Sequence, residues 1–155
     1  MEIDNINKDE LISQTKYLID YSLPLISNLS NLSRLLYECF ENVLWAGFYI
    51  TDFNNPNELV LGPFQGPIAC TKIKFNKGVC GKSAYNKKSL LVPNVHEFEG
   101  HIACSSLSNS EVVVPIIKND LVYGVIDIDS TIFNNFTNED VKILEEFAEL
   151  ISVLF

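Results

Sequence analysis

The stretch EVVVPIIKNDLVYGVIDIDS, residues 111–130, decides the fold. It contains two runs of branched apolar residues, Val112–Ile117 and Leu121–Ile128, on either side of Asn119-Asp120. Branched side chains favour strands, and Asn and Asp favour turns, so this stretch predicts a β-hairpin.

Further strands are predicted before the hairpin. Residues 43–51, 58–64, 69–75 and 90–92 are rich in aromatic and branched side chains, which favour strands. Residues 78–87 favour a short helix. Together with the hairpin, these segments predict a mostly antiparallel sheet that one short helix interrupts.

Helical periodicity marks both ends of the chain. Residues 9–22 and 25–40 carry apolar side chains at helical spacing, and Pro24 suits the first turn of the second helix, where no N–H is needed. Thr137-Asn138-Glu139-Asp140 resembles a capping box and predicts a third helix over residues 138–154. Such terminal helices can pack side by side on one face of a sheet.

These elements predict one domain of α/β (α+β) class over residues 1–155, with the sheet and its loops in about 43–130. A chain of 155 residues, 47% apolar and 20% charged, suits a single hydrophobic core. Residues 94–110 show no sustained period, which predicts a long loop of the functional or lid-like kind. We therefore expect a small-molecule site on the loop side of the sheet.

Charge and hydropathy argue against several partners. A net charge of -9 with 11 scattered basic residues argues against nucleic acid and against an anionic membrane surface. Met1 to Glu10 is polar and acidic, unlike a signal peptide, and no apolar run approaches the roughly 20 residues of a membrane span. We expect a cytoplasmic protein, whose cysteines are core thiols, metal ligands or redox catalysts rather than static disulfides.

The four cysteines differ in setting. Cys39 lies in a predicted helix and is expected to be a core thiol. Cys70, Cys80 and Cys104 lie in loops or at segment ends, where a thiolate can form and meet a substrate. Cys80 falls in the first turn of a helix, where the dipole is expected to lower a thiol pKa, although its flanking glycines also fit a plain turn.

Three acidic residues form a second signal. Asp127 and Asp129 alternate on the last strand and so share one face, which is unusual among apolar neighbours unless that face forms a site. A three-residue loop, 118–120, would set Glu111 opposite Asp127, whereas a two-residue loop would put Glu111 on the wrong face. If the three carboxylates converge, mutual repulsion raises at least one pKa and leaves a carboxylic acid that can donate a proton.

The histidines and aromatic residues have alternative interpretations. His96, His101 and Cys104, with Cys70 or Cys80, could form a zinc site, but the spacing lacks paired CxxC ligands. We instead expect both histidines to shape the approach to Cys104. A second pair, made of Trp45 and Tyr49, lies four residues apart on one strand face and forms either core or an apolar wall for a substrate methyl group.

Six motifs, in order along the chain, resemble those of the free methionine-(R)-sulfoxide reductases, which are single-domain proteins of the GAF fold. They are Trp45-Ala46-Gly47-Phe48-Tyr49, Leu59-Val60-Leu61-Gly62-Pro63-Phe64-Gln65-Gly66, Lys77-Gly78-Val79-Cys80-Gly81, Val92-Pro93-Asn94-Val95-His96, Gly100-His101-Ile102-Ala103-Cys104 and Gly124-Val125-Ile126-Asp127-Ile128-Asp129-Ser130. The resemblance runs from about Val43 to the end, with compatible helices before it. Only the loop over residues 52–57 is slightly longer than is usual in the family.

The resemblance implies a role for each matching cysteine and carboxylate. Cys104 would be the nucleophile, Cys70 its main resolving partner, and Cys80 a second resolving cysteine that some members use. The matching carboxylates would hold the amino group and the sulfoxide oxygen of the substrate; they are Glu111, Asp127 and Asp129.

The resemblance also implies how the rest of the substrate is held. Trp45 and Tyr49 would line the pocket for its methylthio end, and the N–H groups near Val79 and Cys80 would bind its carboxylate. No metal or bound organic cofactor is implied. Electrons would come from thioredoxin, with NADPH behind it through thioredoxin reductase, in a cytoplasmic homodimer that acts in oxidative stress.

The implied reaction is reduction of free L-methionine (R)-sulfoxide to methionine. It would proceed through a sulfenic acid on Cys104 and a Cys70–Cys104 disulfide. Two alternatives remain open: a non-enzymatic GAF sensor of a small molecule or of redox state, which the implied fold also allows, and a zinc-binding regulatory domain.

Overall fold

The strands are arranged as the sequence predicts, in an antiparallel sheet. The computed structural model describes residues 6–102 and 104–155. Within them, six strands form one sheet in the order β3-β2-β1-β6-β5-β4, and each neighbouring pair is antiparallel. The strands are β1 (Val43–Thr51), β2 (Glu58–Gln65), β3 (Lys72–Lys74), β4 (Leu90–Val92), β5 (Ser110–Lys118) and β6 (Leu121–Ser130).

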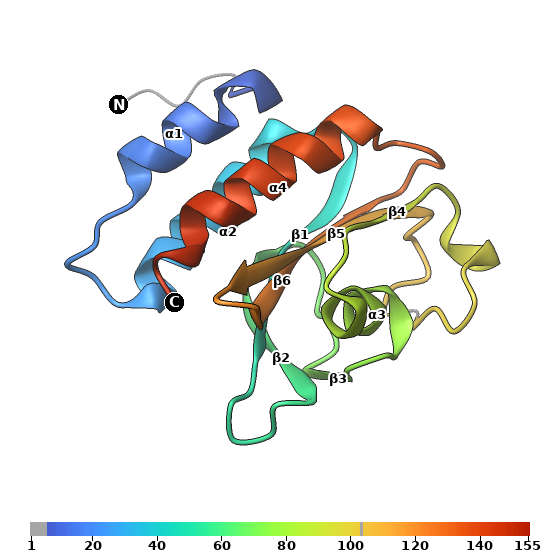
Figure 1. Ribbon diagram of the computed structural model, residues 1–155. Helices are drawn as coiled ribbons and strands as arrows, with labels where there is room; N and C mark the ends of the chain where they lie inside the picture. The colour runs from blue at the N-terminus through green and yellow to red at the C-terminus, as the bar shows by residue number, and fades with distance from the viewer. Residues whose placement is uncertain (1–5, 103) are drawn as a thin grey trace.

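The helices cover the two faces of the sheet unequally. They are α1 (Leu11–Leu18), α2 (Leu25–Cys39), α3 (Gly78–Asn86) and α4 (Asn138–Ser152), with short 3-10 turns η1 (Lys8–Glu10) and η2 (Val95–Glu97). Figure 1 shows α2 and α4 on one face of the sheet, with α1 packed against these two helices, and α3 on the other face. None of the helices in the described part of the chain has both the length and the hydropathy of a membrane span.

Two apolar clusters lie on opposite faces of the sheet, because side chains alternate along each strand. Ile126 and Ile128 of β6 are fully buried in the cluster beneath the terminal helices. Their neighbour Val125 belongs to the second cluster, on the α3 side. Asp127 and Asp129 have the same parity as Val125, so the sheet places these two carboxylates on the face that α3 covers only in part.

The register of the β5–β6 hairpin differs from the one the sequence predicted. The loop has two residues, Asn119 and Asp120, both with left-handed φ (51° and 62°), and Lys118 pairs with Leu121. A bulge between Ile116 and Ile117 then shifts the register by one residue, so that Glu111 lies opposite Asp129 rather than Asp127. Because the bulge offsets the two-residue loop, Glu111 still reaches the face of the carboxylates.

Two elements are shorter than the sequence predicted. The strand expected over 69–75 is limited to β3, the three residues that pair with β2, and Cys70 lies before it in a disulfide with Cys104. The first helix ends at Leu18 rather than at residue 22, because the Asn28 side chain binds the backbone N–H and C=O of Asp20. Pro24 is the N-cap of α2, one residue before the first turn, and η2 lies within the predicted loop.

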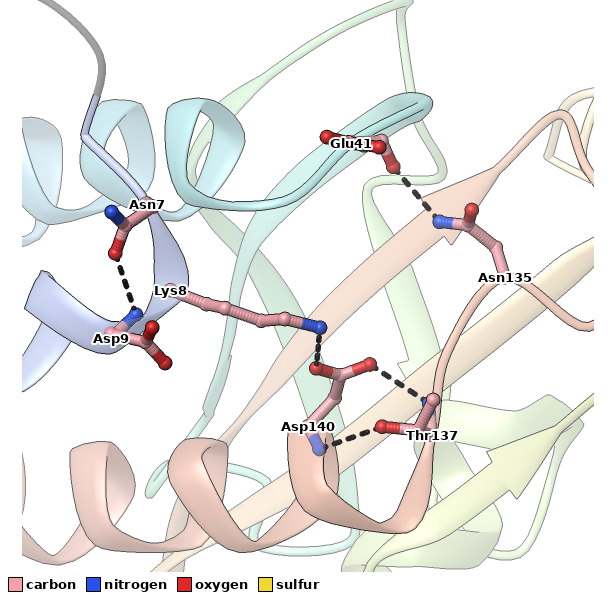
Figure 2. Close-up of polar contacts among 7 residues, drawn as sticks. All are labelled: Asn7, Lys8, Asp9, Glu41, Asn135, Thr137 and Asp140. Atoms are coloured by element: carbon pink, nitrogen blue, oxygen red, sulfur yellow. Dashed lines mark hydrogen bonds and ion pairs between the residues drawn. The ribbon is translucent and has the colours of Figure 1, made fainter.

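The capping box predicted before the last helix is confirmed. Thr137 accepts a hydrogen bond from the Asp140 N–H at 3.2 Å, and the Asp140 carboxylate accepts one from the Thr137 N–H at 2.8 Å. Lys8 adds an ion pair to Asp140 at 2.7 Å (Figure 2). This contact ties the segment before α1 to the start of α4, and so helps to hold the helical layer together.

Candidate active site

A cavity lies on the α3 side of the sheet, and it gathers the residues that the sequence singled out. It is lined by residues of β1, β3, α3, β5 and β6 and by loop residues 67–69, 101, 102, 104, 105 and 108. The lining includes every predicted site residue except Cys70, whose partner Cys104 is part of it. The small-molecule site expected on this side therefore has a cavity to occupy.

Three carboxylates converge on one wall of this cavity. Glu111 and Asp127 are only 5% and 6% exposed, and Asp129 is the direct partner of Glu111 across the two strands. Ser108 donates a hydrogen bond of 2.7 Å to Asp129. The three carboxylates therefore converge, as the sequence predicted for a three-residue loop, but they do so through a two-residue loop and a bulge.

The pKa values of all three carboxyls are raised. Burial is the largest cause, since it disfavours the charged form, and the charge of a neighbouring carboxylate adds to it in each case. Among residues 6–102 and 104–155, no lysine or arginine is ion-paired with any of the three. The cluster therefore favours at least one protonated carboxyl and offers a site for a cation.

The environment of Cys80 corrects the expectation for its thiol. Cys80 lies in the first turn of α3, as predicted, but it is 4% exposed and its Sγ is 4.0 Å from a carboxylate oxygen of Glu111. Burial, and then the charges of Asp127 and Glu111, raise its pKa well above the ordinary value. Desolvation and two nearby carboxylates outweigh the helix dipole, which acts in the opposite direction.

Cys70 and Cys104 form a disulfide across 34 residues of sequence, with their Cα atoms 5.8 Å apart. This is the pair that the family resemblance implied. The Tyr49 hydroxyl donates a hydrogen bond of 3.0 Å to the Cys70 carbonyl and so attaches one side of the disulfide to β1. Ala103, which precedes Cys104 in its motif, lies outside the described residues. So do residues 1–5, which belong to the segment that was interpreted as unlike a signal peptide.

Cys39 is a core thiol, as expected. It is 6% exposed within the cluster under the terminal helices. Burial raises its pKa to about 12, which keeps it as an unreactive thiol at neutral pH. It therefore serves as a matched control for the cysteines around the cavity.

Aromatic rings form a second wall of the cavity. Trp45 stacks on Tyr49 at 5.7 Å between ring centroids, and on Phe64 at 5.1 Å. Phe64 extends the stack beyond the two residues that the sequence singled out. The wall lies beside the carboxylates, because Trp45 is the partner of Asp129 across β1 and β6.

Two polar atoms of the cavity are buried without a hydrogen-bond partner among the residues that the structure describes. They are Trp45 Nε1, which is a donor, and Asp127 Oδ1. A buried polar atom without a partner costs about 1–3 kcal/mol, so such atoms point to a ligand that supplies the missing partners. A ligand that satisfies both must carry an acceptor for the Trp45 N–H and a donor for the Asp127 oxygen.

Both histidines were expected to shape the approach to Cys104, but only one of them lines the cavity. His101 Nε2 lies 3.6 Å from a Glu111 carboxylate oxygen, and burial lowers the pKa of His101. His96 instead has Nε2 at 2.9 Å from Asn109 Oδ1, on the surface, where it joins two parts of the loop. Only His101 thus lines the cavity.

The start of α3 offers backbone donors to the cavity. Val79 and Cys80 occupy the first turn, and within the described part of the chain no side chain caps this N-terminus. Gly78 has a φ of +59°, and Ile102 lies against it so closely that a Cβ would come within 3.0 Å of its side chain. The glycine thus allows the loop that carries Cys104 to pack against the helix start.

Sequence reasoning missed Ser108 and Phe64 and gave no specific partner to His101. Ser108 lies in a stretch without periodicity, where nothing marks which side chain turns inward. Phe64 lies in a predicted strand. Its ring stacks on Trp45 because β2 pairs with β1 so that Phe64 lies opposite Gly47, two residues after Trp45. Both depend on contacts between segments distant in sequence.

Comparisons with known proteins agree with this arrangement. The GAF domain family model matches residues 29–155. The free methionine-R-sulfoxide reductase of Saccharomyces cerevisiae is 43% identical over 157 residues, covering 96% of this chain and 87% of that protein. A structure of fRMsr of Staphylococcus aureus in reduced form has a TM-score of 0.89 at 41% identity, covering 99% of this chain and 98% of the other.

A further structure is that of free methionine-R-sulfoxide reductase from Neisseria meningitidis in complex with its substrate, with a TM-score of 0.84 at 38% identity, covering 96% of this chain and 85% of the other. The fold is therefore that of a GAF domain. Within that class, the chain belongs to the family of free methionine-R-sulfoxide reductases.

Proposed function

We propose that this protein is an oxidoreductase that reduces free L-methionine (R)-sulfoxide to methionine through a thiol cycle. The observation that carries the proposal is the Cys70–Cys104 disulfide beside a cavity with a buried carboxylate cluster and two unpartnered polar atoms. A disulfide that opens onto a ligand cavity suits catalysis better than a disulfide placed for stability. The preference for the (R) epimer rests on the family alone.

In the first step, the Cys104 thiolate attacks the sulfur of the sulfoxide. A protonated carboxyl of the cluster donates its proton to the oxygen, which leaves the substrate sulfur and ends on the cysteine. The products are methionine and a Cys104 sulfenic acid. The raised pKa values of Glu111, Asp127 and Asp129 support this role, because they keep a carboxylic acid available at neutral pH.

In the second step, the Cys70 thiol condenses with the sulfenic acid, which forms the Cys70–Cys104 disulfide and releases water. A dithiol donor of the thioredoxin type then exchanges with this disulfide and restores both thiols. No bound cofactor is needed in this cycle. Cys80 is a reserve resolving thiol, and its raised pKa makes it a slow one.

The cavity supplies a partner for each end of the substrate. The ammonium group binds the carboxylate cluster, where Asp127 Oδ1 accepts one of its hydrogens. The substrate carboxylate takes the N–H groups of Val79 and Cys80 at the start of α3. The methylthio end packs on Trp45 and Tyr49, and the Trp45 Nε1–H donates to the sulfoxide oxygen.

The wider setting of the enzyme is part of the proposal. A disulfide reduced in every turnover needs a compartment with a thioredoxin system, which suggests the cytoplasm and a role in oxidative stress. We also propose a homodimer, on the family resemblance. Sedimentation of the purified protein would test the dimer independently of activity.

The test of this function is NADPH oxidation coupled through thioredoxin and thioredoxin reductase, with the two epimers of free methionine sulfoxide. We expect turnover with the (R) epimer, none with the (S) epimer, and none for Cys104→Ser. Cys39→Ser is the matched control and should keep full activity. A protein that forms its disulfide but turns over neither epimer would instead be a redox sensor.

A further inference from the structure

The cavity contains a set of ligands for a metal ion as well as a substrate site. The Cys80 Sγ, a carboxylate oxygen of Glu111 and one of Asp127 all lie within 4.8 Å of one another. All three residues are buried. Within the described residues, Asp127 Oδ1 is also buried at the cavity without a hydrogen-bond partner, so it is available to bind a ligand.

The cluster lacks positive charge of its own. Within residues 6–102 and 104–155, its single ionic neighbour is His101, at 3.6 Å from Glu111. Two carboxylates and a thiol so close together in a buried site repel one another once they ionise. Any occupant that compensates them must be a cation small enough to reach all three atoms.

The donor set selects the kind of cation. Mg²⁺ and Ca²⁺ prefer oxygen ligands throughout, whereas Zn²⁺ takes thiolate and carboxylate together. Zinc binds at about 2.3 Å to sulfur and about 2.0–2.2 Å to oxygen, so its tetrahedral ligands lie about 3.5 Å apart. The 4.0 Å between Cys80 Sγ and Glu111 therefore needs a contraction of about half an ångström, and any pair near the 4.8 Å limit needs more. Three protein ligands leave the fourth tetrahedral position to water.

We propose that Cys80, Glu111 and Asp127 form a zinc-binding site that competes with the substrate ammonium group. The Cys80 thiol loses its proton on binding and becomes a thiolate ligand. Neither Cys70 nor Cys104 is a ligand, so the site is present while they are joined in the disulfide. Zinc would then be a reversible inhibitor that leaves the catalytic disulfide untouched.

The test uses the oxidised protein without added thiol, in which Cys39 and Cys80 are the free cysteines. Zinc binding is measured by competition with a chromophoric chelator. We expect one ion per chain and a loss of affinity of more than about 100-fold for Cys80→Ser, since loss of an outer-shell partner of a metal site already costs about 10–100-fold. Asp127→Asn should weaken binding similarly, and Cys39→Ser should not change it.

A second measurement does not depend on chelator affinity. In the oxidised Cys39→Ser protein, Cys80 is the remaining thiol, and zinc should slow its alkylation. Circular dichroism of each variant shows that it is folded. Zinc binding that survives Cys80→Ser in a folded protein, or no binding to the wild type, overturns the proposal.

Methionine sulfoxide separates this proposal from the enzymatic one. We expect it to raise the apparent dissociation constant for zinc in the oxidised protein. Zinc binding that depends on Cys80 but does not change with methionine sulfoxide would support the three metal ligands and contradict the competition. The substrate ammonium group would then bind elsewhere. Catalysis without zinc binding would overturn the metal site and leave the proposed reaction intact.

Discussion

Glu111 and Asp129 lie opposite each other across β5 and β6, although the two strands are joined by a two-residue loop. Without the bulge between Ile116 and Ile117, such a loop would turn Glu111 towards the helices. The bulge thus brings a third carboxylate to the face of Asp127 and Asp129. The acidic cluster of the cavity is complete only because of this bulge.

The first prediction concerns pH and stability. The pKa of Asp127 is raised in the folded state, so its contribution to stability is fully present below the unfolded pKa, about 3.9, and is lost as pH rises through the folded value. Relative to wild type, Asp127→Asn should therefore gain free energy of unfolding as pH rises from 4. Urea denaturation across pH measures this, with Glu97→Gln, which replaces an exposed carboxylate outside the cavity lining, as the control. A flat profile for Asp127→Asn contradicts a raised pKa.

The same groups shape the pH dependence of activity. If a carboxyl of the cluster is the acid, kcat should fall as pH rises through its raised pKa. Attack by Cys104 requires its thiolate, which limits the rate from the acidic side. A bell-shaped profile is expected, and its alkaline limb should move in Asp129→Asn. An alkaline limb that stays the same in Asp127→Asn, Asp129→Asn and Glu111→Gln would assign it to another group.

The Trp45 N–H is expected to recognise the sulfoxide oxygen. Trp45→Phe keeps an aromatic ring in the stack but removes the buried donor. Losing one hydrogen bond of about 1 kcal/mol should lower kcat/KM for the sulfoxide about fivefold. Methionine, which lacks that oxygen, should bind the variant as tightly as it binds wild type. An equal loss for methionine would assign the N–H to the substrate carboxylate instead.

Cys70 should be needed for turnover but not for the first reaction. Cys70→Ser is expected to make about one methionine per chain and then stall with thioredoxin present, because the sulfenic acid lacks its partner. Quantifying methionine against time measures the burst. Slow continued turnover that disappears in Cys70→Ser/Cys80→Ser would reveal Cys80 as the reserve thiol, and undiminished turnover of that double variant would contradict the assignment of both.

The contact between Lys8 and Asp140 should matter for stability and not for catalysis. Asp140→Asn removes the ion pair with Lys8 and weakens the bond to the Thr137 N–H. We expect a loss of about 1–2 kcal/mol in the free energy of unfolding with KM unchanged. Glu139→Gln, an exposed neighbour in the same first turn, is the control for charge at the helix start. A changed KM would mean that the helical layer affects the cavity.

Much of the fold follows from local pattern. Strand β1 has the predicted bounds, and the Thr137–Asp140 capping box places the start of α4 correctly, because both depend on residues close in sequence. The bulge at Ile116 and the short β3 could not be predicted in this way. They depend on pairing with distant strands and on the disulfide that Cys70 forms.

The site was predicted unevenly for the same reason. The family resemblance implied that Cys70 and Cys104 pair, which no spacing in the chain indicates. The expected low pKa of Cys80 was wrong, because helix position is visible in sequence whereas burial beside two carboxylates is not. The unpartnered Trp45 Nε1 likewise emerges only once its surroundings are known.

The central claim is that Cys104 transfers electrons to one substrate molecule and passes the oxidation to Cys70. The most direct test mixes fully reduced protein with free methionine (R)-sulfoxide, without any external reductant, and counts both products. The account predicts one methionine per chain, together with one Cys70–Cys104 disulfide in a peptide map. Methionine formed without that disulfide, or no methionine at all, would contradict it.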